Sequence, residues 1–231
     1  MLESKSRTAW SKVTDLNLNF ELSLGLNYTE LLLRDPKRLG FVLSRYKFAA
    51  KMLKSCKRIV EIGCGEGIGS LILLSETKAD FLGIDFDEKQ IAYACDVLLP
   101  NVSKAQPEWG NRARYECRDL TSSPLTRLAD GIVSLDVIEH VDKSEEDIFM
   151  ANMVNAIESH GIAVIGTPNQ CASAFASKRS QIGHINLFTP EKLETLLQAY
   201  FKRVFMFSMN DEVVHTGFGS MAHYIFGIGI K

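Results

Sequence analysis

Three glycines separated by single residues, Gly63, Gly65 and Gly67, stand where a short apolar run over residues 58–62 ends. The run is rich in β-branched residues and too short for an independent helix, so it predicts a buried strand. Glycine opens backbone angles that are closed to other residues, and its missing side chain lets a ligand lie against the main chain. The spacing therefore predicts a turn from strand to helix that holds a nucleotide-type cofactor.

Acidic residues follow three further apolar runs, at Asp85, Asp119 and Asp136. In an open parallel sheet, ligands bind beyond the carboxyl ends of the strands, so these carboxylates are expected to gather at one edge. Asp85 comes roughly 20 residues after the glycines, where an acid can accept hydrogen bonds from both hydroxyls of a ribose. An ordinary turn-forming aspartate is the alternative for Asp119.

A second group of chemically capable residues comprises Asp136, Glu139, His140 and the later His184. The first three are spaced i, i+3 and i+4, which places them on one face of a helical turn. Two carboxylates and two imidazoles could hold one divalent cation such as Mg²⁺. Alternatively, His140 or His184 accepts the proton of an acceptor hydroxyl while Glu139 orients the ring. A third interpretation gives His140 a packing role only.

The glycine spacing separates the candidate cofactors. A dinucleotide fingerprint, G-x-G-x-x-G, would need glycine at position 68 or 70, where this chain has Ile68 or Ser70. A phosphate-binding P-loop would need a Gly-Lys-Ser/Thr ending, which does not follow here. An acid inside the hydrophobic strand, Glu61, is the remaining distinctive feature, and it predicts a carboxylate that orders the turn through backbone N–H groups.

Residues 60–67 resemble the first motif of class I S-adenosylmethionine-dependent methyltransferases. Residues 136–141 and 183–193 are similar to two segments of the ubiquinone-biosynthesis O-methyltransferases, although Asp136 stands where those enzymes usually have glutamate. The resemblance implies S-adenosylmethionine as the cofactor, ribose binding by Asp85, a cover for adenine from Phe86, and contact with the adenine amino group near Asp119. The cofactor-binding residues that it implies are Glu61, Gly63, Cys64, Gly65, Gly67, Asp85, Phe86, Asp119, Leu120 and Asp136. His140 and His184 become the candidate catalytic residues, and Asp136, Glu139, His140 and His184 the candidate metal ligands.

Strands alternate with helices along most of the chain, which predicts a doubly wound α/β sheet. The tail departs from this alternation, because two apolar runs follow each other without a helix and should pair antiparallel. We therefore expect a Rossmann-like, seven-stranded, mostly parallel sheet with a C-terminal antiparallel hairpin and N-terminal helices as a lid. Helices are predicted at residues 28–33, 36–53, 68–77, 88–99 (stopped by Pro100), 145–159 and 190–200, and a surface connection at residues 101–111. The predicted strands are residues 58–62, 81–84, 114–117, 131–135, 162–165, 204–207 and 223–230.

Bulk composition limits the function classes. A chain of 231 residues, 46% of them hydrophobic, is expected to form one domain over residues 1–231. We divide it into a helical lid segment (1–55), a cofactor-binding core (56–170) and an acceptor-side segment with the terminal hairpin (171–231). The net charge of −2 disfavours a nucleic-acid partner. Five scattered cysteines and the lack of an apolar stretch long enough for a membrane span favour a cytoplasmic protein.

The sequence thus predicts an S-adenosylmethionine-dependent methyltransferase acting on a small-molecule acceptor, with a hydroxyl oxygen as the expected nucleophile. Methylation of nitrogen or carbon on a sugar or another metabolite is an alternative. A nicotinamide-dependent oxidoreductase and a non-catalytic cofactor-binding scaffold are the alternatives from other classes. The sequence also leaves open whether the apolar final strand lies inside the sheet or at the edge of a homodimer.

Overall fold

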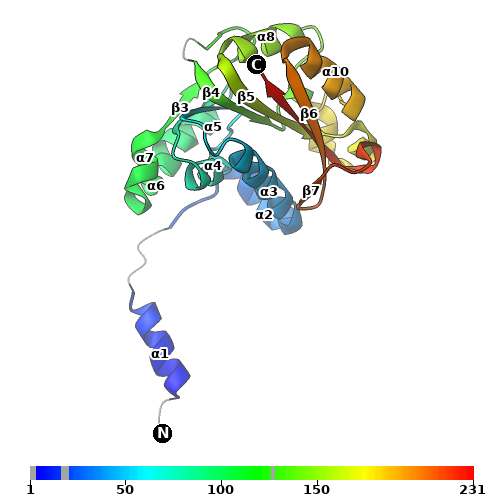
Figure 1. The fold of residues 1–231 in the computed structure, drawn as a ribbon. Helices are drawn as coiled ribbons and strands as arrows, with labels where there is room; N and C mark the ends of the chain where they lie inside the picture. Colours follow the sequence, from blue (N-terminus) through cyan, green and yellow to red (C-terminus); the bar gives the residue numbers. More distant parts are fainter. Residues whose placement is uncertain (1–3, 17–20, 126–127) are drawn as a thin grey trace.

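The computed structural model describes residues 4–16, 21–125 and 128–231, and it shows one eight-stranded sheet between two layers of helices (Figure 1). The strand order is β3-β2-β1-β4-β5-β8-β6-β7. The strands are β1 (Arg58–Ile62), β2 (Asp80–Asp85), β3 (Ala113–Cys117), β4 (Ala129–Leu135), β5 (Ile157–Pro168), β6 (Arg203–Asn210), β7 (Val213–His215) and β8 (Tyr224–Ile230).

The first five strands are parallel and carry the candidate cofactor residues at their carboxyl ends. β1 lies at the centre of this half, with β2 on one side and β4 on the other. Four of its five residues are buried because helices cover both faces of the sheet. The strand order reverses beside β1, and this switch point is where open α/β sheets bind their ligands.

The last three strands are antiparallel, as the tail of the sequence predicts. β8 lies between β5 and β6 and pairs with both, so the apolar final strand is inside the sheet. The prediction of seven strands is wrong by one, since the connection between the two predicted strands contains the short β7. Three residues of mixed polarity at the sheet edge bury little surface, so their pattern gives no strand signal.

Most of the longer helices of the described chain pack on the two faces of the sheet. The helical elements are α1 (Lys5–Thr14), α2 (Gly25–Arg34), α3 (Pro36–Met52), α4 (Ser70–Glu76), α5 (Glu88–Tyr93), η1 (Ala94–Leu98), α6 (Leu99–Ala105), α7 (Pro107–Arg112), η2 (Ile138–His140), α8 (Glu146–Asn155), η3 (Gln170–Phe175), α9 (Lys178–Gly183), α10 (Pro190–Tyr200) and η4 (Gly219–Met221). Side chains from α3 to α6 pack on one face and those of α8 and α10 on the other. Among the described residues, none of these helices is long and apolar enough to cross a membrane.

The prediction that Pro100 stops a helix is wrong. The chain stays helical through a π-helical turn, η1, and α6 begins at Leu99 with Pro100 in its first turn. A proline is tolerated there because the first backbone N–H groups of a helix have no intrahelical partner. Pro107 opens α7 in the same way, so the predicted surface connection at 101–111 is mostly helical.

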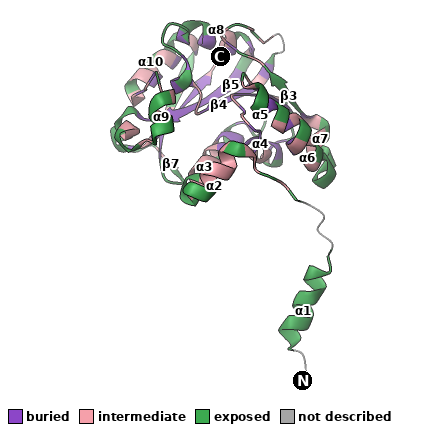
Figure 2. Cartoon of the chain, turned by 180° about the vertical axis from the view of Figure 1, so that it is seen from behind, coloured by how far each residue is buried: buried purple, intermediate pink, exposed green. Residues whose placement is uncertain are grey.

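The N-terminal helices differ in burial (Figure 2). In α3 the side chains of Tyr46, Ala49 and Ala50 are buried against the sheet, whereas α2 has no buried residue. α3 is therefore part of the hydrophobic core, and α2 is the more exposed layer of the predicted lid. α1 has no buried residue either, and it stands apart from the sheet (Figure 1).

Candidate active site

The glycine turn after β1 adopts the backbone conformation that its spacing predicts. Gly63, Gly65 and Gly67 have φ values of 76°, 55° and 79°, a region that side chains with a Cβ rarely adopt. Each missing side chain leaves room for a protein neighbour: a Cβ at Gly63 would lie 2.2 Å from Val137 Cγ2, and one at Gly65 would lie 2.8 Å from Gln90 Oε1. The turn thus packs tightly against α5 and against the segment that follows β4.

Asp85 lies next to this turn. Its Oδ2 accepts a hydrogen bond from the N–H of Gly65 at 2.9 Å, and its Oδ1 accepts one from the N–H of Asp87 at 2.9 Å. Burial raises the pKa of the Asp85 carboxyl, and the bonds from the backbone of Asp87 and Gly65 oppose this shift. Each carboxylate oxygen keeps a second lone pair for a ligand hydroxyl. The next residue, Phe86, is 72% exposed, so an apolar ring stands uncovered at the same strand end.

The other predicted cofactor residues differ in how their side chains lie. Asp119 is exposed, and its Oδ1 accepts bonds from the N–H and the hydroxyl of Thr121, while Leu120 is buried in the core. Cys64 is buried, and its Sγ lies 3.7 Å from the carbonyl oxygen of Gly65. Cys64 therefore presents backbone, not side chain, at the turn.

Glu61 is buried in a network of hydroxyl groups. Ser70 Oγ donates a hydrogen bond to Glu61 Oε2 at 2.5 Å, and the hydroxyl of Tyr46 also bonds to this carboxyl. Among the described residues these hydroxyls replace the backbone N–H groups that the sequence predicts as partners. Burial raises the pKa of Glu61 to about 7 despite the two bonds, which lower it. Glu61 thus links β1 to α3 and α4 below the turn.

The substitution Glu61→Gln is expected to flatten the pH dependence of stability. A glutamate with an ordinary pKa of 4.5 loses its proton in the unfolded chain, whereas folded Glu61 keeps it up to about pH 7. Protonated Glu61 therefore stabilises the fold fully below pH 4.5. As the pH rises toward 7 this stabilisation is lost, which lowers the free energy of unfolding by about 3 kcal/mol. Urea denaturation at pH 5 and pH 7.5 measures the change, and a wild-type slope in the Glu61→Gln variant contradicts it.

The predicted histidine pair comes together after β4. Ligand atoms of Glu139, His140 and His184 all lie within 4.8 Å of one another, and the two imidazole rings are 4.9 Å apart, edge to face. His140 Nδ1 lies 2.8 Å from the carbonyl oxygen of Gly183, which can only accept, so this nitrogen carries the proton and Nε2 keeps its lone pair. Burial and the neighbouring His140 lower the pKa of His184.

Asp136, the fourth predicted ligand, lies near this group but is paired with Arg45 instead. Its backbone has φ 58°, and Nη1 of Arg45 donates to both carboxylate oxygens at 2.8 Å. Glu139 is fully buried, accepts a bond from the Thr167 hydroxyl at 2.9 Å, and has its pKa raised to about 8 by burial and by the nearby Asp136. The structure thus gathers three of the four predicted ligands and assigns the fourth to an ion pair.

α2 is fastened to the glycine turn by a buried carboxylate. Glu66 Oε1 accepts a bond from the N–H of Asn27 at 2.9 Å, and Oε2 accepts one from the N–H of Tyr28 at 3.3 Å. A carboxylate is favoured at the N-terminus of a helix because the first backbone N–H groups point toward it. The side chain of Asn27 also donates to Gln90 Oε1 on α5.

The acceptor-side segment reaches the same helix. Arg179, from α9, donates to Asn27 Oδ1 at 2.7 Å and forms an ion pair with Glu30 at 3.0 Å. The cofactor turn and the acceptor-side segment are therefore both bonded to α2. The sequence gives no signal for this arrangement, because Lys178 and Arg179 read as an ordinary solvated pair of cations.

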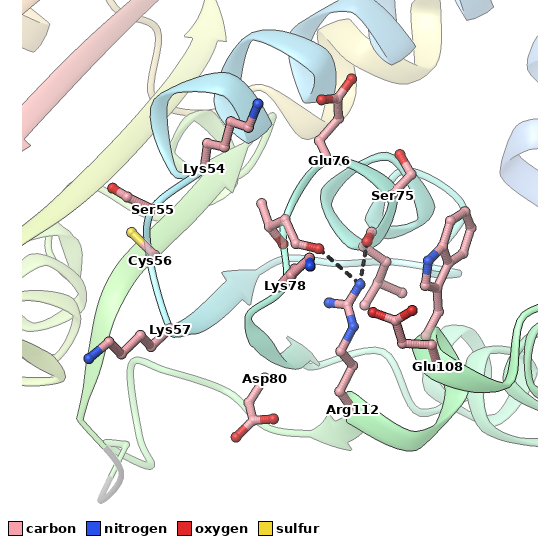
Figure 3. A pocket seen from close by; sticks show the side chains of 13 residues that line it. Lys54, Ser55, Cys56, Lys57, Ser75, Glu76, Lys78, Asp80, Glu108 and Arg112 are labelled. Carbon is pink, nitrogen blue, oxygen red and sulfur yellow. Dashed lines mark hydrogen bonds between the residues drawn. The ribbon is translucent and has the colours of Figure 1, made fainter.

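A separate pocket opens at the opposite edge of the sheet (Figure 3). It lies beside the amino ends of β1 and β2, away from the glycine turn, and several lysines line it. The guanidinium of Arg112 is occupied there by the carbonyl oxygens of Leu74, Thr77 and Ala79. Because ligands of such sheets bind at the carboxyl edge, this pocket is not the candidate active site.

Comparison with known proteins relates the chain to methyltransferases. A family model described as a methyltransferase domain matches residues 35–200. Curated relatives include ubiquinone biosynthesis O-methyltransferases of Rickettsia bellii, 28% identical over 144 residues, and of Rickettsia canadensis, 27% identical over 148 residues. These matches cover 61% of this chain in both cases, and 54% and 55% of the relatives. The chain thus spans about half the length of the curated relatives that it matches.

Solved structures share the fold. The methyltransferase domain of bacterial CtHen1-C matches with a TM-score of 0.65 and 18% identity, over 81% of this chain and 97% of that one. The N-methyltransferase NodS of Bradyrhizobium japonicum, in complex with S-adenosyl-L-homocysteine, matches with a TM-score of 0.62 and 16% identity, over 90% and 93%. The fold, with its glycine turn after β1, is that of a methyltransferase domain. The chain belongs to the methyltransferase domain family.

Proposed function

We propose that this protein transfers a methyl group from S-adenosylmethionine to a hydroxyl oxygen of a small-molecule acceptor. The observation that carries the proposal is the carboxyl edge of the sheet, where Asp85 is bonded to the glycine turn and His140 and His184 meet two strands away. The names of the Rickettsia relatives favour oxygen as the nucleophile. NodS is an N-methyltransferase of similar fold, so a nitrogen acceptor is the alternative to test.

The residues at the turn fit such a cofactor. The oxygens of Asp85 are already aligned by two backbone N–H groups and can each accept a ribose hydroxyl. The exposed ring of Phe86 offers an apolar face for adenine. Thr121 bonds to Oδ1 of Asp119, and within the described residues Oδ2 is left for an amino group. When bound, S-adenosylmethionine supplies a methyl group on a positively charged sulfur.

The contribution of the protein is alignment and proton removal. Rigid placement of the nucleophile against the methyl group is worth up to about 7–11 kcal/mol of the barrier. We assign the proton acceptor to His140, because the carbonyl of Gly183 fixes its Nδ1 proton and leaves Nε2 free. Such a base adds about 10²–10⁴-fold to the rate. The lowered pKa of His184 keeps the adjacent ring neutral near pH 7, so that it does not repel the proton on His140.

The second role proposed for Glu139, His140 and His184 is to hold a Mg²⁺ ion. Glu139, His140 and His184 offer one carboxylate and two imidazoles, whereas Mg²⁺ prefers oxygen ligands. Asp136, which would add oxygen, is held by Arg45. This donor set suits a transition metal better than Mg²⁺, so we give the proton-acceptor role precedence.

The test is turnover with matched hydroxyl and amine acceptors, measured as formation of S-adenosylhomocysteine. We expect methylation of the hydroxyl, and a decrease in kcat of about 10²–10⁴-fold in His140→Gln with unchanged affinity for S-adenosylhomocysteine. His160→Gln, at an exposed position on β5, is the matched control. Faster methylation of the amine contradicts oxygen as the nucleophile, and loss of activity in EDTA that Mn²⁺ restores favours the metal.

A further inference from the structure

Three buried polar atoms without a hydrogen-bond partner lie where α3 meets the start of β8. In the described part of the chain, they are Arg45 Nε, His223 Nε2 and Tyr224 Oη. Buried polar groups are nearly always bonded, so a group of unpartnered ones calls for a specific explanation. None of the three belongs to the residues that the sequence predicts for the site.

The three side chains are close because one turn of α3 lies over the first residues of β8. The ring of Phe41 meets that of His223 edge to face at 5.8 Å, and four residues later the guanidinium carbon of Arg45 lies 3.8 Å from the centroid of the Tyr224 ring. The ring of Tyr224 is fixed over Gly166, where a Cβ would lie 2.7 Å from its hydroxyl. The nearby backbone N–H of Asp136 is already donated to the carbonyl oxygen of Gly166.

The unpartnered atoms offer both donors and an acceptor. Arg45 Nε–H donates, and the Tyr224 hydroxyl can donate or accept. His223 Nδ1 donates to the carbonyl oxygen of Met209 at 3.2 Å, which leaves Nε2 as an acceptor. Burial and the charge of Arg45 lower the pKa of His223, so the ring is neutral near pH 7.

The charge of the group is balanced. Arg45 carries one positive charge, and Asp136 matches it at 2.8 Å. Glu139 lies within electrostatic reach of both Arg45 and Tyr224, so the group borders the histidine pair. A carboxylate or phosphate bound here would meet the Asp136 carboxylate and no unmatched cation. An uncharged group would satisfy all three atoms at no such cost.

The three unpartnered atoms are themselves buried, but the ion pair beside them reaches solvent. The side chain of Asp136 is 33% exposed and that of Arg45 is 13% exposed, and Asp136 directly follows β4 at the carboxyl edge. This is the edge at which the candidate active site lies.

We propose that Arg45, His223 and Tyr224 form a subsite that binds an uncharged hydrogen-bonding group of the acceptor, a hydroxyl or a carboxamide, beside the reacting atom. The inference rests on the proposed function, since it names the class of acceptor for the same site. It predicts that acceptors carrying a carboxylate or phosphate at this position are rejected.

The test compares two probes of the same shape, 3-hydroxybenzamide and 3-hydroxybenzoate, titrated into the complex with S-adenosylhomocysteine. We expect the neutral probe to bind at least tenfold more tightly. The substitution Tyr224→Phe should weaken the neutral probe about 5–20-fold, the effect of losing one hydrogen bond, and leave the affinity for S-adenosylhomocysteine unchanged. Tyr200→Phe is the matched control, because its hydroxyl bonds to Asp147 on α8, away from the subsite.

Equal binding of the two probes, binding of neither, or an unchanged affinity in Tyr224→Phe overturns the proposal. Thermal unfolding of Tyr224→Phe gives a second readout. An unpartnered hydroxyl can be removed without loss of Tm, so a decrease of several degrees shows that it serves the fold instead. If the wild type does not bind S-adenosylhomocysteine, this contradicts the proposed function but not the subsite. The two probes are then titrated into the free protein.

Discussion

The substitution Asp85→Ala is expected to weaken binding of S-adenosylhomocysteine about 10²–10⁴-fold. Asp85 is the acid that the glycine turn itself holds in place, through the N–H of Gly65 at 2.9 Å. Two hydrogen bonds from ribose hydroxyls to a charged carboxylate contribute about 1.5–3 kcal/mol each, and alanine removes both. Alanine also leaves the N–H groups of Gly65 and Asp87 without their present acceptor.

Calorimetric titration measures this loss, and two variants control it. Asp85→Asn keeps a side-chain oxygen for one of the two backbone bonds, and we expect an intermediate affinity. Asp119→Ala removes an exposed carboxylate whose bonded partners belong to its own turn, so a decrease of less than about tenfold is expected. An Asp85→Ala protein that binds as tightly as the wild type would falsify the assignment of ribose binding to Asp85.

The substitution Gly63→Ala is expected to lower the free energy of unfolding by about 3 kcal/mol and to abolish cofactor binding. Gly63 has φ 76°, which costs a residue with a Cβ about 1–2 kcal/mol. The added Cβ would also lie 2.2 Å from Val137 Cγ2, an overlap that must displace either the turn or the segment after β4. Overpacking of this kind costs typically about 1–3 kcal/mol.

A double variant separates the two causes. Gly63→Ala combined with Val137→Ala removes the overlapping methyl group but keeps the backbone strain, so it should recover part of the stability lost in Gly63→Ala. Urea denaturation of the two single variants and the double variant gives their coupling. Purely additive losses show that the Val137 contact does not limit this turn.

The central strands β1, β2 and β4 were predictable from sequence because each is a short, mostly apolar run that ends at, or is followed by, a glycine or an acid. β1 and β2 follow this pattern, and their carboxyl ends carry the predicted turn and Asp85. The α5-to-α7 region was not predictable in the same way, since Pro100 looks like a stop signal whether or not a new helix begins beside it. A local pattern cannot distinguish a proline that ends a helix from one that opens the next helix, because packing decides between the two.

The candidate site was predictable where a residue lies within a recognisable local motif. His140 and His184 were found from their motifs, but the ion pair of Arg45 with Asp136 joins residues 91 positions apart. Arg45 lies on a helix whose pattern looks like scaffold, and Tyr224 reads as an ordinary strand residue. Only the fold brings these side chains to the same edge, so their contribution to the site had no signal in the sequence.

The position of β8 has a consequence for how the protein folds. In the described sheet, β6 and β7 are joined to β5 only through β8, whose residues follow those of β5, β6 and β7 along the chain; Ile230 pairs with both Ile162 and Arg203. Bringing these distant segments together costs loop-closure entropy before any of their hydrogen bonds form. We therefore expect the parallel half to form first and the hairpin to dock in the slowest step. A nascent chain that lacks residues 224–230 would expose an unpaired edge of β5, the strand beside the histidine pair.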